Sequence, residues 1–195
     1  MKSANEILRA PSLRVIIGAR DQKWDGWVPT QQADLDLTRP ESFVAWFGAR
    51  RADAFLCEHV LEHLSEEDGL AAAKLCFAYL KPGGFLRCAV PDRNFPDTEY
   101  QRTVQVGGPG PADHPAAGHK VVYDHRRLTH IFQHAGFGVD LLEYCDDEGR
   151  FHYNGWDVGK GPVYRSLLLD HRNRDGRLGF VSLILDAHKP GATAS

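Results

Sequence analysis

His59, Glu62 and His63 are the residues whose types and spacing could most directly do chemistry. They form the pattern His-x-x-Glu-His. On one helical turn, two histidines at this spacing can bind zinc while the glutamate acts as a base. Such a site needs a third protein ligand, for which Glu143 is the candidate. The competing interpretation is that Glu62 and His63 only line the start of a helix. We expect this structural role and therefore predict no bound metal.

A second group of candidate residues lies between residues 92 and 123. Asp92 and Asn94 directly follow an apolar run, and His119 and Tyr123 lie in a long polar loop that also contains Asp113, His114 and Lys120. Histidine titrates near neutral pH, so His119 could serve as a base. Histidines in polar loops are more often bystanders. The residue types alone leave both interpretations open.

Short apolar runs bounded by turn residues predict the strands that must position these groups. Residues 13–17 form a β-branched run that ends at Gly18, and residues 53–57 form another. The segments 26–30 and 33–37 are separated by only a few residues, whereas parallel neighbours need a crossover of a dozen or more. One of these two segments is therefore expected to be degenerate.

The segment from residue 53 to residue 92 has the strongest local signals. A helix is expected from Glu58, with Ser65 and Asp68 spaced as a capping box that starts or restarts it. Apolar residues recur at helical spacing until the breakers of 81–84, and a strand follows at 85–90. Strand, helix and strand in this order build parallel sheets.

The second half of the chain predicts one helix and two strands. Asp124 can cap a helix that ends at Gly136, and strands are expected at 137–144 and 180–186. Because no helix joins these strands, we expect an antiparallel pair at the sheet edge. The aromatic and charged segment 146–178 between them is either a solvated hairpin extension, a substrate cover or a dimer contact.

Composition excludes several classes of protein. The 195 residues, 43% hydrophobic and 25% charged, suit a single domain with its own core. The net charge of −3 and the scattered basic residues argue against nucleic acid as a partner. No apolar run is long enough for a membrane span or for a signal peptide within Met1–Leu13, so a cytoplasmic location and reduced cysteines are expected.

Residues 53–92 resemble the middle of the seven-strand S-adenosylmethionine-dependent methyltransferases of type 11. The resemblance is carried by Glu58-His-Val-Leu-Glu-His-Leu64, Leu80-Lys-Pro-Gly-Gly84 and Val90-Pro-Asp92, and by an Ala-Gly-Phe helix end at 135–137. It covers roughly residues 13–189. It implies an α/β fold with a Rossmann-like, mostly parallel sheet flanked by helices, an antiparallel strand pair at the C-terminal edge and a truncated first crossover. The whole chain, 1–195, would be one domain with insertions at about 93–123 and 146–178.

The resemblance also implies where S-adenosylmethionine binds. In this family the cofactor lies across the carboxyl ends of the first strands, where a glycine turn approaches its methionyl part. The cofactor-binding residues implied are Gly18, Ala19, Asp36, Glu58 and His59. The catalytic residues implied are Asp92 and His119, which follow the strand after which these enzymes commonly build substrate contacts. Gln31 stands near the position where the family usually has an acid that holds the ribose.

The leading functional hypothesis is transfer of the sulfonium methyl group to an unidentified small or medium substrate by direct displacement, which depends mainly on alignment. A noncatalytic protein of the same fold that binds a partner or metabolite is the alternative, because the turn after residue 17 has one glycine and Gln31 replaces the acid. A zinc hydrolase using the His59-x-x-Glu62-His63 pattern, which resembles that of inverzincins, is third. An oligomer is possible.

Overall fold

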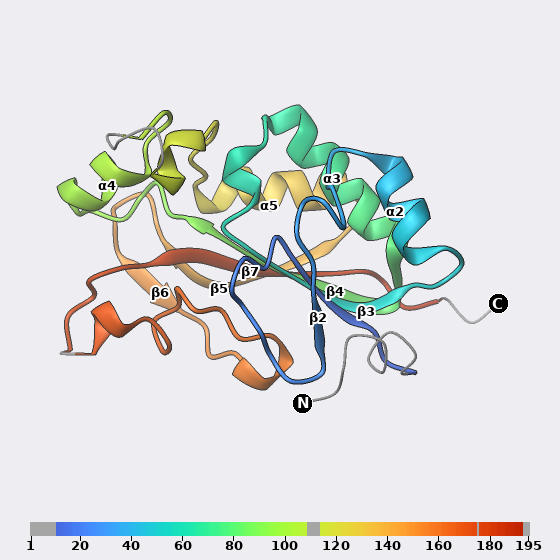
Figure 1. Cartoon of the computed structure of the whole chain (residues 1–195). Coiled ribbons are helices and arrows are strands. Elements are labelled where there is room, and N and C mark those ends of the chain that lie inside the picture. The colour runs from blue at the N-terminus through green and yellow to red at the C-terminus, as the bar shows by residue number, and fades with distance from the viewer. Residues whose placement is uncertain (1–10, 109–113, 175, 193–195) are drawn as a thin grey trace.

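The computed structural model describes residues 11–108, 114–174 and 176–192. Within these residues, seven strands form one mixed sheet in the order β2-β1-β3-β4-β7-β5-β6 (Figure 1). Their bounds are β1 Arg14–Ile17, β2 Trp27–Pro29, β3 Ala52–Glu58, β4 Leu80–Pro91, β5 Gly138–Cys145, β6 Phe151–Tyr153 and β7 Ser182–His188. β2, β1, β3 and β4 are mutually parallel, whereas β7 pairs antiparallel with both β4 and β5. The expected α/β fold with an antiparallel C-terminal edge is confirmed.

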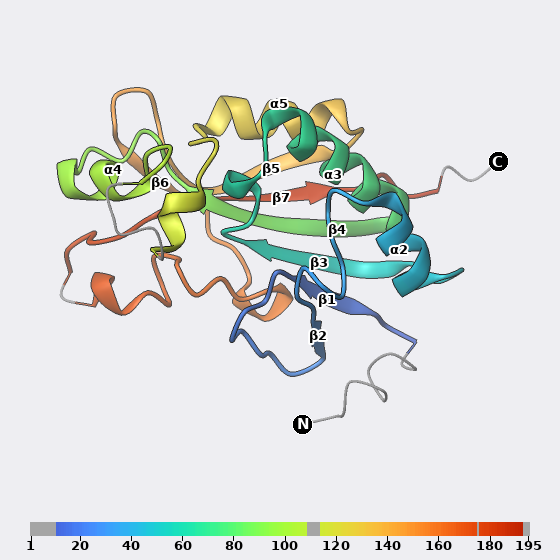
Figure 2. The same ribbon diagram turned by 45° about the horizontal axis from the view of Figure 1, so that its top comes forward.

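One face of the sheet is covered by helices α2 (Pro40–Phe47), α3 (Glu66–Tyr79) and α5 (His125–His134), as Figures 1 and 2 show. The capping residues expected from the sequence begin two of them. Ser65 Oγ accepts a hydrogen bond from Asp68 N at 3.1 Å, and Asp124 Oδ1 accepts one from Arg127 N at 2.8 Å. These bonds satisfy N–H groups that a helix leaves free at its start, so both caps act at the positions that the sequence predicts.

The helix expected from Glu58 does not begin there. β3 runs through Glu58, and the chain then bends at His59, whose φ of 55° is uncommon for a residue other than glycine. A short 3₁₀ turn, η1 (Leu61–His63), precedes α3. The capping box therefore starts α3 anew, and the residues of the His-x-x-Glu-His pattern do not share one α-helical turn.

The first crossover is a loop. The described structure has no helix between β1 and β2, and β2 is only three residues long. The segment 33–37 contains a turn and no strand. The prediction that one of the two early segments is degenerate is thus confirmed, and the sheet ends at β2.

The opposite face of the sheet is covered mainly by irregular chain. The described residues of the segment 155–178 (155–174 and 176–178), orange to red in Figure 1, run on the side away from the helices. It includes the 3₁₀ turns η3 (Val158–Lys160) and η4 (His171–Asn173). Beneath it lies Arg87 on β4, 1% exposed, whose guanidinium donates to both carboxylate oxygens of Asp186 at 2.8 and 2.7 Å. The same group donates to the carbonyls of Asp157 and Gly161, so a buried ion pair anchors the insertion to the sheet.

Two further helical segments lie beyond the carboxyl end of β4. They are α4 (Thr98–Val104) and the 3₁₀ turn η2 (Pro115–Gly118). Residue 113, one of the polar loop residues singled out above, lies outside the described residues. All four cysteines are free and buried. No helix in the described part of the chain is long and apolar enough to cross a membrane.

Candidate active site

The turn after β1 requires the glycine found there. Gly18 has φ of 62°, and a Cβ atom at this position would lie 2.7 Å from Val60 Cγ2. Both the backbone conformation and the space therefore exclude a side chain. Ala19 N then donates to Thr30 O at 2.8 Å, which joins this turn to the end of β2. The carboxyl ends of β1, β2 and β3 consequently meet around Gly18.

Gln31 stabilises the same turn from the other side. Its Oε1 atom accepts from Arg20 N at 3.2 Å, and its Nε2 atom donates to Arg20 O at 2.9 Å. A carboxylate could accept the first bond but could not donate the second. The neutral residue at this position, where the family usually has an acid, therefore has a structural role in shaping the turn after β1.

A cavity of about 630 Å³ opens at this edge, and we call it the cofactor cavity. Three of the five residues implied for cofactor binding line it: Gly18, Asp36 and His59. The other lining residues are Ile17, Arg20, Gln31, Gln32, Leu35, Leu37, Thr38, Val60, His63, Leu64, Asp68, Pro115 and Lys120. The volume is within the range of small-molecule sites, roughly 300–1,000 Å³. Apolar side chains thus lie beside polar and charged ones, as a nucleoside-sized ligand requires.

Asp36 is held in place within this wall. Burial acts to raise its pKa, but hydrogen bonds from Thr38 and Gln32 outweigh this effect and leave the pKa below the ordinary aspartate value. Its Oδ1 atom accepts from Thr38 N at 2.9 Å and from Thr38 Oγ1 at 2.7 Å. A carboxylate that is charged and fixed in this way can accept hydrogen bonds from hydroxyl or amino groups of a ligand.

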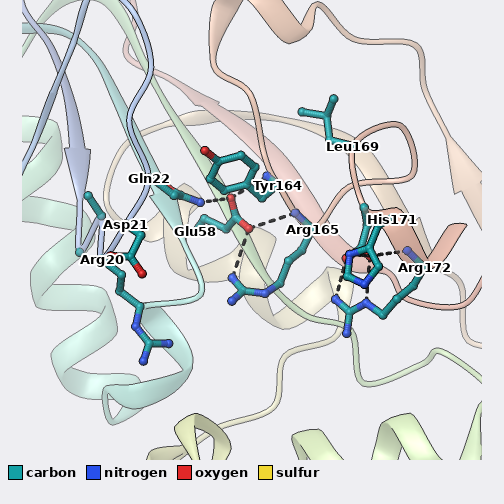
Figure 3. Close-up of a pocket in the computed structure, with 12 residues that line it drawn as sticks. Arg20, Asp21, Gln22, Glu58, Tyr164, Arg165, Leu169, His171 and Arg172 are labelled. Atoms are coloured by element: carbon teal, nitrogen blue, oxygen red, sulfur yellow. Dashed lines mark hydrogen bonds and ion pairs between the residues drawn. The ribbon is translucent and has the colours of Figure 1, made fainter. Parts of the chain in front are cut away.

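A second cavity of about 600 Å³ lies on the other side of Gly18, and we call it the insertion cavity (Figure 3). It contains the two remaining residues implied for cofactor binding, Ala19 and Glu58. Its far wall consists of residues of the 146–178 segment: Tyr164, Arg165, Leu169, Asp170, His171 and Arg172. The sequence alone left the role of this segment open between a solvated extension, a cover and a dimer contact. In the structure, it forms one wall of a cavity.

Glu58 connects this wall to the sheet. Its carboxylate accepts hydrogen bonds from Tyr164 N at 2.9 Å and Arg165 N at 3.0 Å, and from the side chain of Gln22. Arg165 Nη1 lies 3.2 Å from Glu58 Oε1. Burial raises the pKa of Glu58, although Arg165 and the backbone N–H groups oppose this effect. The Glu58 carboxylate is therefore occupied by protein groups and positions the insertion.

Asp92 lies away from both cavities. It is fully buried, and its two carboxylate oxygens accept from Asn94 N at 2.8 Å and Cys145 N at 2.6 Å. Tyr100 Oη accepts from Asp92 N at 2.7 Å. These bonds join the end of β4 to the end of β5. The side chain predicted as catalytic thus has contacts that explain it as a structural connector.

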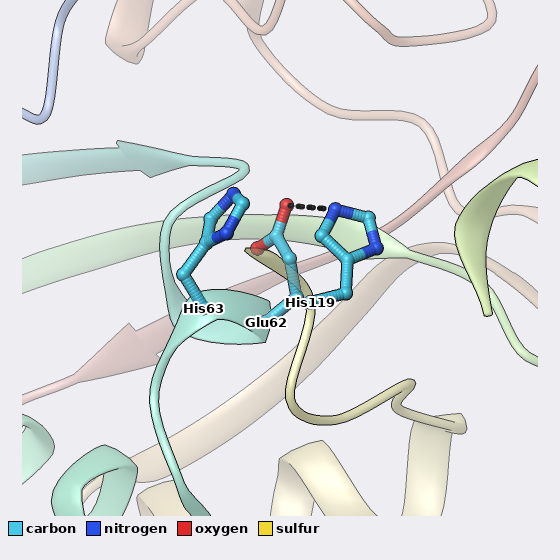
Figure 4. A group of neighbouring side chains, drawn as sticks. All are labelled: Glu62, His63 and His119. Atoms are coloured by element: carbon cyan, nitrogen blue, oxygen red, sulfur yellow. Dashed lines mark ion pairs between the residues drawn. The ribbon is translucent and has the colours of Figure 1, made fainter. Parts of the chain in front are cut away.

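His119 lies close to Glu62 and His63, although it is far from them in the sequence (Figure 4). His119 Nε2 is 4.0 Å from Glu62 Oε1, and the two histidine rings are 4.9 Å apart in an edge-on arrangement. These three residues, the Glu62 cluster, could hold a metal ion because their potential ligand atoms all lie within 4.8 Å of one another. Glu143, suggested as a third ligand, instead lies on β5 and accepts from Trp156 Nε1 and Leu167 N.

Tyr164 was not among the predicted site residues, and His63 was considered only as part of the His-x-x-Glu-His pattern, although each lines one of the two cavities. The recognisable signal for Tyr164 was the unusual aromatic and charged composition of segment 146–178. No comparable signal linked His63 to His119, because their proximity depends on how the loop after β4 folds back. Lys120 N and Val121 N both donate to Glu62 O, and these bonds fix that return.

The sequence and the fold were compared with known proteins. A family model described as a methyltransferase domain matches residues 6–142. A comparison with curated proteins finds no match.

Solved structures with a similar fold include an O-methyltransferase family protein from Burkholderia thailandensis, with a TM-score of 0.53, 9% identity and coverage of 97% of this chain. The chain spans only 56% of that protein. A SAM-dependent methyltransferase from Archaeoglobus fulgidus has a TM-score of 0.51 and 13% identity, with 96% of this chain and 95% of that one covered. A putative methyltransferase of Haloferax volcanii, solved in complex with the Trm112 activator, has a TM-score of 0.51 and 14% identity, with 96% and 88% covered.

Proposed function

The chain belongs to the methyltransferase-domain family, and from that premise we propose that it transfers the methyl group of S-adenosylmethionine to a small or medium-sized acceptor. S-adenosylmethionine supplies a sulfonium-bound methyl group that a nucleophile can displace directly. The protein's contribution to such a reaction is alignment of the reacting groups, which needs few catalytic side chains. The observation that carries the proposal is the cofactor cavity at the carboxyl ends of β1 and β3.

The residues present fit this cofactor. Gly18 lines the edge of the cavity, where the backbone of its turn can contact a ligand's amino-acid part. Asp36 offers a fixed carboxylate to the hydroxyl or amino groups of an adenosine, and Val60 and Leu64 offer apolar surface to its ring. Lys120 supplies a cation on the same wall for the methionyl carboxylate. In this assignment His59 is a wall residue of the cavity.

The two insertions would then close the site. Pro115 and Lys120 of the insertion at about 93–123 line the cofactor cavity, and Tyr164 and Arg165 of the insertion at 146–178 line the insertion cavity. Because Gly18 borders both cavities, an acceptor in the insertion cavity would lie next to the cofactor. In the proposed single domain, Glu58 and Ala19 position this acceptor side. A small-molecule acceptor suits the net charge of −3 better than a nucleic acid.

A noncatalytic protein that binds a partner or metabolite is the second candidate. Gln31 favours this candidate, because its side-chain amide already makes two hydrogen bonds to the Arg20 backbone. The amide is therefore less available to hold a cofactor's ribose. A zinc hydrolase receives no support from the His-x-x-Glu-His pattern itself, since His59 lies in a bend before η1 and the Glu143 carboxylate accepts hydrogen bonds from Trp156 and Leu167 instead.

Calorimetric titration with S-adenosylmethionine and S-adenosylhomocysteine tests the proposal. The unaltered chain is expected to bind both saturably. Asp36→Ala should weaken binding by about 1–3 kcal/mol, because a ligand hydrogen bond to a charged group is lost. Asp25→Ala, an exposed carboxylate of the β1–β2 loop outside the cofactor cavity, is the matched control and should change nothing.

Gly18 is less suitable as a test position, because any side chain there meets Val60 and would alter the fold as well as the cavity. Absence of binding at millimolar ligand would refute cofactor use. Binding that Asp36→Ala leaves unchanged would show that the cofactor lies elsewhere. Binding without methyl transfer to any acceptor supplied would favour the noncatalytic candidate.

A further inference from the structure

Glu62 is a buried carboxylate without a hydrogen-bond partner. Its side chain is 0% exposed, and neither carboxylate oxygen has a partner with hydrogen-bond geometry. His59 Nδ1 approaches Oε1 to 3.3 Å but lies outside that geometry. Burial of an unpaired carboxylate is costly, so natural proteins usually pair such a group or use it to bind a ligand. Glu62 therefore requires an explanation that the contacts within the chain do not supply.

Two further imidazoles, those of His63 and His119, lie near this carboxylate. His119 Nε2 lies 4.0 Å from Glu62 Oε1, and one ligand atom from each of Glu62, His63 and His119 lies within 4.8 Å of the other two. Metal–ligand distances for these atom types are about 2.0–2.2 Å. Small side-chain movements would therefore bring all three atoms into contact with one ion placed between them.

The environment of both imidazoles orients them for coordination. His119 Nδ1 lies 2.8 Å from Val104 O, so Nδ1–H donates to this carbonyl and the Nε2 lone pair points toward Glu62. The His63 ring packs against the Gly118 backbone, where a Cβ atom would lie 3.0 Å from His63 Nδ1. Histidines that bind metals commonly have their second nitrogen held by a carbonyl, as Val104 O holds that of His119.

We propose that Glu62, His63 and His119 form a binding site for one divalent transition-metal ion in the wall of the cofactor cavity. Two imidazole nitrogens and one carboxylate suit zinc, manganese or ferrous iron, whereas magnesium and calcium prefer oxygen ligands alone. Three protein ligands leave coordination positions open, and His63 places the site at the edge of the cofactor cavity. An ion there would lower the pKa of a water molecule bound to it. The site itself does not depend on the proposed function.

A different pair of histidines provides the control. His130 and His134 lie one turn apart on α5, both exposed, with ring centroids 3.8 Å apart. Two such imidazoles on a helix surface can bind a metal ion adventitiously. The double variant His130→Ala/His134→Ala removes this pair and leaves the Glu62 cluster intact.

The experiment is a calorimetric titration of the full, tag-free chain with ZnCl₂ after treatment with a chelator. We expect one ion per chain in the unaltered protein and in the His130→Ala/His134→Ala variant. Glu62→Gln and His119→Ala should each raise the Kd for zinc by on the order of 100-fold or more. Loss of a ligand should cost more than the 10–100-fold that is typical when a residue hydrogen-bonded to a ligand is lost. Titration with Co²⁺ should give a visible absorption spectrum in the unaltered protein that Glu62→Gln lacks.

Several results would overturn the site. These are no Zn²⁺ binding by the unaltered chain at millimolar concentration, equal affinity in Glu62→Gln, or loss of the ion only in His130→Ala/His134→Ala. Glu62→Gln preserves the side-chain size and removes a buried charge, so it keeps the test valid if His119→Ala fails to fold. The titration omits S-adenosylmethionine, so failure of the proposed function would leave its outcome unchanged.

Discussion

The two faces of the sheet are held by different kinds of interaction. On the helix face, apolar side chains such as Phe43, Phe55, Leu128 and Phe132 form one continuous buried cluster. On the opposite face the apolar cluster is smaller and includes Ala19, Ala54 and Ala89. There the buried groups Arg87, Glu58 and Glu143 bind backbone atoms of the insertion. The helix face thus depends on apolar burial, whereas the insertion face depends on a few polar contacts between distant segments.

Because of this difference, the two faces should respond differently to amino-acid substitution. Apolar packing is non-directional and tolerates exchange among residues of similar volume. A buried charge must keep each specific partner or it becomes strongly destabilising. The insertion face also borders the candidate active site through Glu58, Tyr164 and Arg165. We therefore expect mutations on the two faces to differ in kind, with global unfolding on one and local release of the insertion on the other.

The largest effect is expected on the helix face. Phe132 is 0% exposed on α5 and packs against Phe137, with ring centroids 5.8 Å apart. Phe132→Ala should lower the free energy of unfolding by about 3–5 kcal/mol, because it removes buried apolar area and leaves a cavity. Urea denaturation followed by circular dichroism measures this. A loss below about 1 kcal/mol would show that the helix face is not the main source of stability.

A somewhat smaller effect is expected from Arg87→Met, about 3 kcal/mol, because Asp186 is left as an unpaired buried charge. Limited proteolysis should also cleave the segment 155–178 faster in Arg87→Met than in Phe132→Ala. The two variants are compared under conditions that give them the same free energy of unfolding. Arg87→Met/Asp186→Leu should recover part of the lost stability, but not all of it. The carbonyls of Asp157 and Gly161 still lack their donor in that variant. Unchanged proteolysis in Arg87→Met would contradict the proposed anchoring of the insertion.

The smallest effect concerns pH. Burial raises the pKa of Glu58 and Glu143 above the ordinary value of 4.5, although hydrogen bonds and charges oppose it. The folded state then binds protons more tightly than the unfolded state. These groups therefore contribute most stability below about pH 4.5 and lose it as pH rises through the folded pKa.

Glu58→Gln/Glu143→Gln should consequently show a weaker decline in unfolding free energy between about pH 5 and pH 8 than the unaltered chain. Denaturation with urea at both pH values measures the difference. An identical slope in the two proteins would assign the pH dependence to other groups.

Local signals predicted the helix face well. The cap at Ser65, the cap at Asp124 and the apolar spacing between residues 66 and 80 are contained within a few turns of chain. Their energetic effect depends on neighbours three or four residues away, which the sequence displays directly. The prediction of a helix from Glu58 was wrong, because His59 adopts a positive φ that its residue type does not indicate.

The sequence by itself determined the strand-helix-strand unit of residues 53–91, the single-glycine turn at Gly18 and the resemblance to methyltransferases, because each of these depends on residues close together in the chain. Only the tertiary structure decided that Glu58 holds the insertion and that Asp92 connects two strands. It also brought His119 to Glu62 and His63. These contacts join residues far apart in the sequence, and a loop's path is set by hydrogen bonds such as those from Lys120 N and Val121 N to Glu62 O. Spacing along the chain carries no record of such bonds, because they are made by backbone groups that nearly every residue has.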